Sequence, residues 1–265
     1  MAAAAAVLCV AAVVSAAAVP AEAQPLQEVF AALCDNATAA EAVTQWALAE
    51  AAEATRAVAG ETAALPSCEA VAAGVSWTVA ARAPNTGAHR SLDATVHGAH
   101  TLLPRCALVY AVARTAFVDV YQSALQNPTA RVRVRTDTGA AEQDLEAPSW
   151  AAAARPALAV VAPVPRGSRA AALDVHLRYQ PPRAGGGYRA DTPAVAAAFL
   201  YAPCAAAAAP HRAAFRLVPP TPARASLLGD TRVPVADTRH RWFVTPITFA
   251  CTILGAIAVV LAVRP

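Results

Sequence analysis

The clearest alternation in the chain is Leu173-Asp174-Val175-His176-Leu177-Arg178-Tyr179. Apolar or aromatic residues stand at every second position, and an aspartate, a histidine and an arginine stand between them. A period of two places successive side chains on opposite faces of a strand. The stretch therefore predicts a half-buried β-strand, with Asp174, His176 and Arg178 on its polar face.

Further strand-like runs lie on both sides of this stretch. Alternation recurs at 75–79 and 131–135, and largely apolar runs occupy 107–112, 157–162 and 195–201. Breaks containing proline and glycine separate the runs, at a spacing typical of an antiparallel sandwich. Gly185-Gly186-Gly187 predicts a flexible loop. We therefore expect residues 71–204 to form a mainly β domain, antiparallel and sandwich-like.

The segment before this domain, residues 24–70, has a helical period. Leu26, Val29, Phe30 and Leu33 recur at spacings of three and four, and the period continues from Val43 to Glu50. Alanine occupies 76 positions of the chain, so alanine content alone is weak support for helix here. The pattern predicts a helical hairpin on the β domain. A free amphipathic membrane helix is disfavoured because the polar face is acidic.

The first 23 residues resemble a secretory signal peptide. Residues 2–19 carry no charge, and Ala21-Glu22-Ala23 matches an A-x-A cleavage site. Cleavage there would leave Gln24 as the first residue of the mature chain. The alternative is an uncleaved anchor helix, against which Pro20 argues because it breaks a helix.

A second apolar block, residues 242–263, is long enough to cross a bilayer. It carries no formal charge, and a helix of that length covers roughly 33 Å. Residues 205–241 are rich in alanine and proline and predict a stalk. A cleaved signal implies a single-pass type I protein with a lumenal bulk and a cytosolic tail of residues 264–265. Within the block, small residues recur and suggest a helix-packing face: Thr248, Cys251, Thr252, Gly255 and Ala256.

Four cysteines fall in the predicted lumenal part, where disulfides form. They are Cys34, Cys68, Cys106 and Cys204, and sequence alone leaves three pairings open. We expect the pairs Cys34–Cys68 and Cys106–Cys204. The usable glycosylation sequon is at Asn36, because Pro128 blocks the one at Asn127.

Catalytic and nucleic-acid-binding functions find little support. The net charge is +3 with scattered arginines, which argues against a polyanion partner. Asp137-Thr138-Gly139-Ala140 matches the core of an aspartic-protease motif, but a second copy is lacking and a surface turn is favoured. His97 and His100 lack a third metal ligand, and the acidic residues of the domain have no spacing that indicates a glycosidase pair. We therefore expect neither catalysis nor a cofactor or metal.

Four stretches, taken in order, carry a family resemblance. They are Gly87-Ala88-His89-Arg90; Cys106-Ala107-Leu108-Val109 with Phe117-Val118-Asp119-Val120-Tyr121; Asp144-Leu145-Glu146-Ala147-Pro148-Ser149-Trp150; and Val175-His176-Leu177-Arg178-Tyr179-Gln180-Pro181-Pro182. Together they resemble the PIG-X family, the small subunit of glycosylphosphatidylinositol (GPI) mannosyltransferase I. The last two stretches are the most specific. The resemblance covers about residues 87–204 and the C-terminal apolar helix, whereas residues 25–70 have no counterpart.

The resemblance implies a non-catalytic subunit in the endoplasmic reticulum membrane. It implies a lumenal β domain that binds and stabilises PIG-M, the polytopic mannosyltransferase. The complex transfers the first mannose from dolichol-phosphate-mannose to the glucosaminyl-phosphatidylinositol precursor. The family-like positions and possible partner contacts are His89, Arg90, Asp119, Glu146, Pro148, His176, Arg178 and Tyr179. The competing interpretation is a type I cell-surface binding glycoprotein with a β-sandwich ectodomain.

Overall fold

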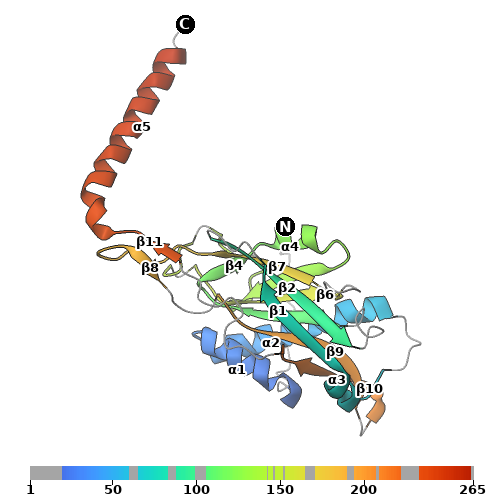
Figure 1. Ribbon diagram of the computed structural model, residues 1–265. Helices are drawn as coiled ribbons and strands as arrows, with labels where there is room; N and C mark the ends of the chain where they lie inside the picture. The colour runs from blue at the N-terminus through green and yellow to red at the C-terminus, as the bar shows by residue number, and fades with distance from the viewer. Residues whose placement is uncertain are drawn as a thin grey trace, which may run out of the picture.

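Nine strands in the described part of the chain form two antiparallel sheets that pack face to face (Figure 1). The structure is a computed structural model, and it describes residues 20–59, 65–82, 88–98, 106–141, 143–145, 147–151, 153–164, 171–189, 194–206, 209–221 and 233–263. The predicted signal peptide lies outside these residues up to Val19, and the predicted tail, 264–265, also lies outside them.

The smaller sheet has four strands in the order β1-β2-β7-β4. Their bounds are β1 Val75–Ala81, β2 His89–Gly98, β7 Ala171–Leu177 and β4 Ala116–Val118. The larger sheet has five strands in the order β10-β9-β3-β6-β5. Their bounds are β10 Ala209–Val218, β9 Val195–Ala206, β3 Ala107–Val112, β6 Ala157–Ala162 and β5 Arg131–Thr136. The expected antiparallel, mainly β fold is thereby confirmed.

One hydrophobic core fills the space between the two sheets. Its largest fully buried side chains include Trp77 of β1, Tyr110 of β3, Leu173 of β7 and Leu200 of β9. These residues come from alternate positions of their strands, as the period of two predicts. The Trp77 Nε1–H donates a hydrogen bond of 2.8 Å to the Val218 carbonyl oxygen, which ties β1 of one sheet to the end of β10 in the other.

A helical hairpin covers the outer face of the five-stranded sheet. Helix α1 (Gln24–Leu33) and helix α2 (Ala37–Ala59) pack on the central strands β3, β6 and β9, and they lie on the lower side of the domain in Figure 1. Strands β3 and β6 are therefore buried on both faces, which explains why their sequences are continuous apolar runs rather than alternating ones. The predicted N-terminal hairpin is confirmed.

One set of polar contacts caps the start of α2, and another joins the helix to the sheet. The Asn36 Oδ1 accepts hydrogen bonds from the backbone N–H groups of Thr38 (2.9 Å) and Ala39 (3.2 Å), so this exposed side chain caps the helix. Near the middle of α2, the Trp46 ring lies 4.9 Å from the Arg135 guanidinium of edge strand β5. Alternate arginines of β5 thus face the helix and solvent while its valines enter the core.

The disulfide joins Cys68 to Cys204, with a Cα–Cα distance of 4.9 Å, so the expected pairing was wrong. Cys68 begins the short helix α3 (Cys68–Gly74), which lies beside β9. Cys34 packs with the helical layer on the other side of the five-stranded sheet. Cys106 precedes Ala107, which pairs with Tyr201, so Cys106 lies opposite Ala202 rather than Cys204. Burial raises the pKa of the Cys34 thiol and of the Cys106 thiol to about 12.

Helix α4 (Val120–Gln126) covers the edge of β7 that the short strand β4 leaves unpaired. The Asn127 side chain accepts a hydrogen bond from the Ala172 N–H (2.9 Å) and donates one to the Ala172 carbonyl oxygen (2.7 Å). The Ser123 hydroxyl oxygen accepts one from the Asp174 N–H (2.9 Å). Side chains of α4 thus replace a missing strand, which prevents an open edge.

We predict that Asn127→Ala lowers the free energy of unfolding by about 2–3 kcal/mol, because buried N–H and C=O groups of β7 lose their partners. Chemical denaturation of the purified chain measures the change. Thr129→Ala, at an exposed position two residues away, should change stability by less than about 0.5 kcal/mol. Equal losses in the two variants would show that α4 does not protect this edge.

Two described parts of the predicted stalk, residues 209–218 and 233–235, form strands. Residues 209–218, expected to belong to the stalk, form β10 in the five-stranded sheet. The expected flexible glycine loop instead leads into β8 (Gly187–Arg189), which pairs with β11 (Val233–Val235) in a two-stranded ribbon. Gly186 has a φ of +55°, and a side chain there would meet the Val235 carbonyl at 3.2 Å. Glycine is therefore required at this turn.

Helix α5 (Arg241–Val263) follows the ribbon and extends away from the β domain (Figure 1). The short 3₁₀ helix Thr238–His240 precedes it directly. Residues Thr238–Val263 are long and apolar enough to cross a membrane, and none of their apolar stretch is buried. Pro246 lies in the second turn of α5. The predicted single C-terminal span therefore agrees with the structure.

Candidate interaction site

A row of aromatic and polar side chains crosses the outer face of the four-stranded sheet. Strand register places His89 of β2 opposite His176 of β7, and His176 opposite Phe117 of β4. The adjacent row pairs Ser91 with Asp174. Residues from the first, second and fourth family-like stretches therefore meet on one surface, although they are far apart in the sequence.

The two imidazoles form the centre of this row. His89 Nδ1 lies 2.8 Å from His176 Nε2, so one ring donates a hydrogen bond to the other. Two carboxylates approach them, with Asp119 Oδ2 at 3.3 Å from His176 Nε2 and Asp174 Oδ1 at 3.6 Å from His89 Nε2. The Phe117 ring stacks on His176 at a centroid distance of 5.1 Å. The polar face predicted for β7 is present, but it is partly covered by its neighbours.

This cluster has the geometry of a structural network rather than of a nucleophilic relay. The Ser91 hydroxyl donates to the Asp174 carboxylate, so among the described residues it does not form the serine–imidazole pair of a nucleophilic relay. Asp119 also accepts the Gln122 N–H at 2.8 Å and thereby begins α4. Within the described residues, no group of three or more histidine, cysteine or acidic side chains is placed to bind a metal ion. His97 is exposed, and His100 lies outside the described residues.

Arg178 is buried, whereas the alternation predicts an exposed contact. Its guanidinium holds the backbone of a neighbouring loop, and we call this arrangement the Arg178 clamp. Only 2% of the residue is exposed. Its Nη1 donates hydrogen bonds to the carbonyl oxygens of Asp144 and Ala147, the latter at 2.7 Å, and its guanidinium lies 5.0 Å from the Phe117 ring centroid. Burial lowers the pKa of this guanidinium. Strand β7 ends at Leu177, so Arg178 turns beneath the loop that carries the Asp144–Trp150 stretch.

Arg90 is likewise buried, and its Nη1 donates to the His89 carbonyl at 2.8 Å.

The clamp brings together the two most specific family-like stretches. The Ser149 N–H donates to the Tyr179 carbonyl oxygen at 2.9 Å, and the Ser149 hydroxyl donates to Gln180 Oε1 at 3.1 Å. The aromatic side chains that follow these contacts remain exposed, Trp150 by 54% and Tyr179 by 77%. We call Trp150 and Tyr179 the aromatic pair. Large exposed aromatic residues on ordered backbone are typical of protein interfaces.

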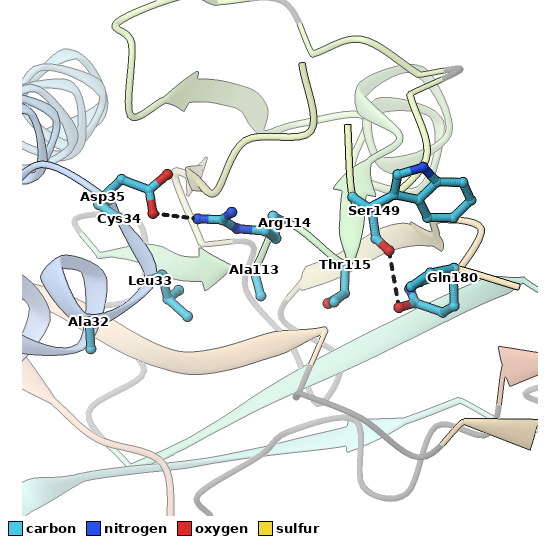
Figure 2. A pocket seen from close by; sticks show the side chains of 11 residues that line it. Ala32, Leu33, Cys34, Asp35, Ala113, Arg114, Thr115, Ser149 and Gln180 are labelled. Carbon is cyan, nitrogen blue, oxygen red and sulfur yellow. Dashed lines mark hydrogen bonds and ion pairs between the residues drawn. The ribbon is translucent and has the colours of Figure 1, made fainter. Parts of the chain in front are cut away.

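A pocket of about 410 Å³ opens beside Trp150 (Figure 2). One wall carries Ser149 and Gln180, and the opposite wall comes from the end of α1 with Cys34 and Asp35. Between them, Arg114 forms an ion pair of 2.8 Å with Asp35. The N-terminal segment, for which the sequence suggested no role, thus supplies part of the surface beside the aromatic pair. Neither Asp35 nor Arg114 lies in a motif that could have revealed this contact.

The remaining predicted positions fall in several places. Pro148 is half-buried beside Ser149, and Glu146 lies outside the described residues. The five small residues of α5 are exposed, and two of them donate hydroxyl hydrogen bonds along their own helix: Thr248 to Val244 (2.8 Å) and Thr252 to Thr248 (2.9 Å). Asp137 follows β5 in a turn with Gly139 at φ +82°, as the surface-turn interpretation requires. Burial raises the pKa of Asp137, and Arg155 approaches it at 3.8 Å.

A comparison with protein families gives one match, the model described as PIG-X / PBN1, over residues 85–264. Comparisons with curated proteins and with solved structures give no match. The matched region contains the histidine row, the Arg178 clamp, the aromatic pair and α5. The family is associated with the endoplasmic reticulum membrane and is involved in GPI mannosyltransferase I function, where it is known as an accessory subunit. The match covers more than half of the chain, and this protein therefore belongs to the PIG-X / PBN1 family.

Proposed function

We propose that this protein is the non-catalytic subunit of GPI mannosyltransferase I that binds and stabilises a PIG-M-like catalytic subunit. The observation that carries the proposal is the family match over the β domain and α5. In this role the protein supports transfer of the first mannose from dolichol-phosphate-mannose to the glucosaminyl-phosphatidylinositol precursor. In the histidine cluster the Ser91 hydroxyl donates to Asp174 rather than to an imidazole, which is compatible with a binding role.

Two surfaces would meet the catalytic subunit. The first is the aromatic pair with the adjacent pocket, where desolvation of Trp150 and Tyr179 would favour binding. The second is the face of α5 with Thr248, Thr252 and Gly255, whose small side chains would let another membrane helix approach closely. Both hydroxyls already have acceptors within α5, so this face would pack without buried unsatisfied donors.

The two surfaces are linked by a short ordered path. The Arg183 N–H donates to the Ala236 carbonyl oxygen at 3.0 Å, and the Thr238 N–H donates to the Arg183 carbonyl oxygen at 3.1 Å. Arg183 follows Tyr179 by four residues, and Thr238 precedes the start of α5 by three. A polytopic membrane partner could therefore contact the aromatic pair and α5 at the same time.

The proposal includes a topology. Residues 1–23 would act as a cleaved signal peptide, α5 as a single type I span, and the β domain would lie in the lumen. The helical segment 24–70 and the domain 71–204 would then share the oxidising compartment that a Cys68–Cys204 disulfide needs. The Asn36 side chain is exposed and caps α2 through its Oδ1, whereas glycosylation modifies the amide nitrogen. The nitrogen would therefore remain accessible to glycosylation.

A depletion and rescue experiment tests the function. Depletion should lower both the surface display of GPI-anchored proteins and the level of the PIG-M-like subunit. Rescue with the wild-type chain should restore both. The double variant Trp150→Ser/Tyr179→Ser should recover at least about ten-fold less partner on co-purification, because loss of a single hot-spot aromatic costs about 2 kcal/mol or more of binding. The stability of the β domain should not change.

Tyr121→Ser is the matched control, since Tyr121 is an 85% exposed aromatic residue on α4 outside the aromatic pair. It should rescue like the wild type. Unchanged GPI display after depletion would contradict the proposed function and favour a surface glycoprotein. Normal partner levels with accumulated precursor would instead indicate a role in the reaction itself.

A further inference from the structure

Helix α4 turns its apolar side to solvent and its polar side to the domain. Tyr121, Ala124 and Leu125 share one side of the helix, because they stand three and four residues apart. All three are exposed, Tyr121 by 85% and Leu125 by 82%. A surface helix of a globular protein normally has the opposite arrangement. We call Tyr121, Ala124 and Leu125 the α4 face.

The polar side of α4 has a structural reason that does not apply to the α4 face. Ser123 and Asn127 point inward because their hydrogen bonds replace a strand beside β7. The outward side has no such requirement, and polar residues there would keep the helix in place equally well. Large apolar side chains exposed together are typical of a surface that meets a protein or a membrane.

The absence of charge around the α4 face favours a lipid surface. Residues 120–130, which include all of α4 and the turn after it, contain no charged side chain. Moving this segment into the region between lipid headgroups and acyl chains would therefore not require the desolvation of an ion. Tyrosine, with an apolar ring and a polar hydroxyl, is a residue enriched in that region.

The position of α4 relative to α5 is consistent with this occupant. In Figure 1 α4 lies along the upper side of the domain, at the level of the β8–β11 ribbon, and α5 rises from the ribbon on the same side. The helical hairpin lies on the lower side. Strand β7, which α4 contacts, leads toward Arg183, whose N–H is bonded to the Ala236 carbonyl oxygen shortly before α5. A bilayer crossed by α5 would therefore lie over the side of the domain that carries α4.

The start of α5 marks the level of the membrane surface. Trp242 of α5 and Tyr188 of the ribbon are exposed aromatic residues of the kind that lies at this level. Because α5 already places the chain in the bilayer, even a small second contact would act at a high effective concentration. We propose that the α4 face contacts the interfacial region of the bilayer that α5 crosses and holds the β domain against the membrane surface.

This contact requires neither the catalytic subunit nor a particular side of the membrane. It sets the orientation of the β domain, whereas α5 keeps the chain in the bilayer. Tyr121→Ser leaves both Leu125 and α5 in place, so the rescue expected from that variant is unchanged. A test on the chain alone therefore distinguishes failure of the lipid contact from failure of the proposed function.

Fluorescence of the full chain in lipid nanodiscs tests the contact. A thiol-reactive NBD probe is attached at Ala124→Cys, in a chain that also carries Cys34→Ala and Cys251→Ala. Cys106 is buried and Cys68 and Cys204 are bonded to each other, so none of these three competes for the label. The discs contain phosphatidylcholine with or without a lipid that carries a doxyl quencher near the glycerol backbone.

We expect the doxyl lipid to lower the emission of the Ala124 probe by at least about two-fold, because an interfacial helix lies at the depth of the quencher. The matched control is the same probe at Ala49→Cys, an exposed position of α2 on the opposite side of the domain. Its emission should not change. No quenching of the Ala124 probe, or equal quenching of both probes, would overturn the proposal.

Leu125→Glu in the chain with the Ala124 probe is the decisive variant. It puts a charge on the α4 face, so quenching should fall to the level of the Ala49 probe. The fold should be kept, because Leu125 is exposed, and Leu125→Ser should act in the same direction. Ala42→Glu, at an exposed position of α2, adds the same charge on the opposite side and should leave quenching unchanged.

Two further results would contradict the lipid contact. Quenching that persists in Leu125→Glu would show that the probe, rather than the α4 face, enters the bilayer. A blue shift of the Ala124 probe that depends on protein concentration in detergent, without quenching by the doxyl lipid, would assign the α4 face to a contact between copies of the chain.

Discussion

Removing the Cys68–Cys204 disulfide is expected to lower the free energy of unfolding of the β domain by about 4 kcal/mol. The bond closes a loop of 136 residues, and closing so long a loop strongly restricts the unfolded chain. A loss of this size is a large part of the stability of a domain, which is about 5–15 kcal/mol. Denaturant unfolding of the double variant Cys68→Ala/Cys204→Ala, compared with the wild type under non-reducing conditions, measures it.

Two other cysteines serve as controls for this prediction. Cys251→Ala, at an exposed position of α5, should leave the unfolding of the β domain unchanged. Cys34→Ala should cost much less than the double variant, because Cys34 is a half-buried free thiol. A bridge between Cys34 and Cys68 found by peptide mapping would contradict the structure, as would identical unfolding of the wild type with and without reductant.

Arg178→Ala is expected to lower the free energy of unfolding by about 3 kcal/mol. The substitution leaves the carbonyl oxygens of Asp144 and Ala147 without their donor and removes the guanidinium from the Phe117 ring. The Asp144–Trp150 stretch should loosen, and partner recovery should fall together with stability. Urea denaturation and hydrogen exchange at the Ala147 and Ser149 amides provide the two readouts.

Arg216→Ala is the matched control, because Arg216 is an exposed arginine on β10. It should change stability by less than about 0.5 kcal/mol. Arg178→Lys separates geometry from charge, since lysine keeps the charge but lacks the planar guanidinium that lies over the Phe117 ring and carries Nη1 to the two carbonyl oxygens. Stability intermediate between the wild type and Arg178→Ala is expected. A fully stable Arg178→Ala chain would show that the loop is held without the clamp.

The main architecture could be predicted from the period of the apolar residues. Alternation identified β1, β5 and β7, and continuous apolar runs identified β3, β6 and β9. Such runs fit strands buried on both faces, and the helical hairpin that buries the second face was also visible in the spacing around Leu26 and Phe30. Local sequence carries this information because each side chain must face either the core or solvent.

The other features depend on contacts between distant segments. Strand β10 and the β8–β11 ribbon are short or interrupted by proline, so their stability comes from partners rather than from pattern. The disulfide pairing depends on which layer each cysteine occupies, which the sequence does not show. Arg178 continues the polar face of β7, yet the backbone carbonyls of Asp144 and Ala147 accept its hydrogen bonds and it is buried. Alternation predicts the direction of a side chain but not what later covers it.

The β8–β11 ribbon has a consequence for how a membrane partner would bind. The Arg183 N–H donates to the Ala236 carbonyl oxygen and the Thr238 N–H donates to the Arg183 carbonyl oxygen, which holds the β domain at the start of α5. The Arg239 guanidinium and N–H both donate to Asp237, which lowers the pKa of that carboxyl. Two contact surfaces joined by a long flexible tether would act at a low effective concentration, whereas a short rigid connection raises it. Once α5 packs against a partner helix, the domain would already be near its second contact and would lose little further orientational entropy. In that complex Gly186 would thus contribute to avidity, although it lies on neither of the proposed contact surfaces.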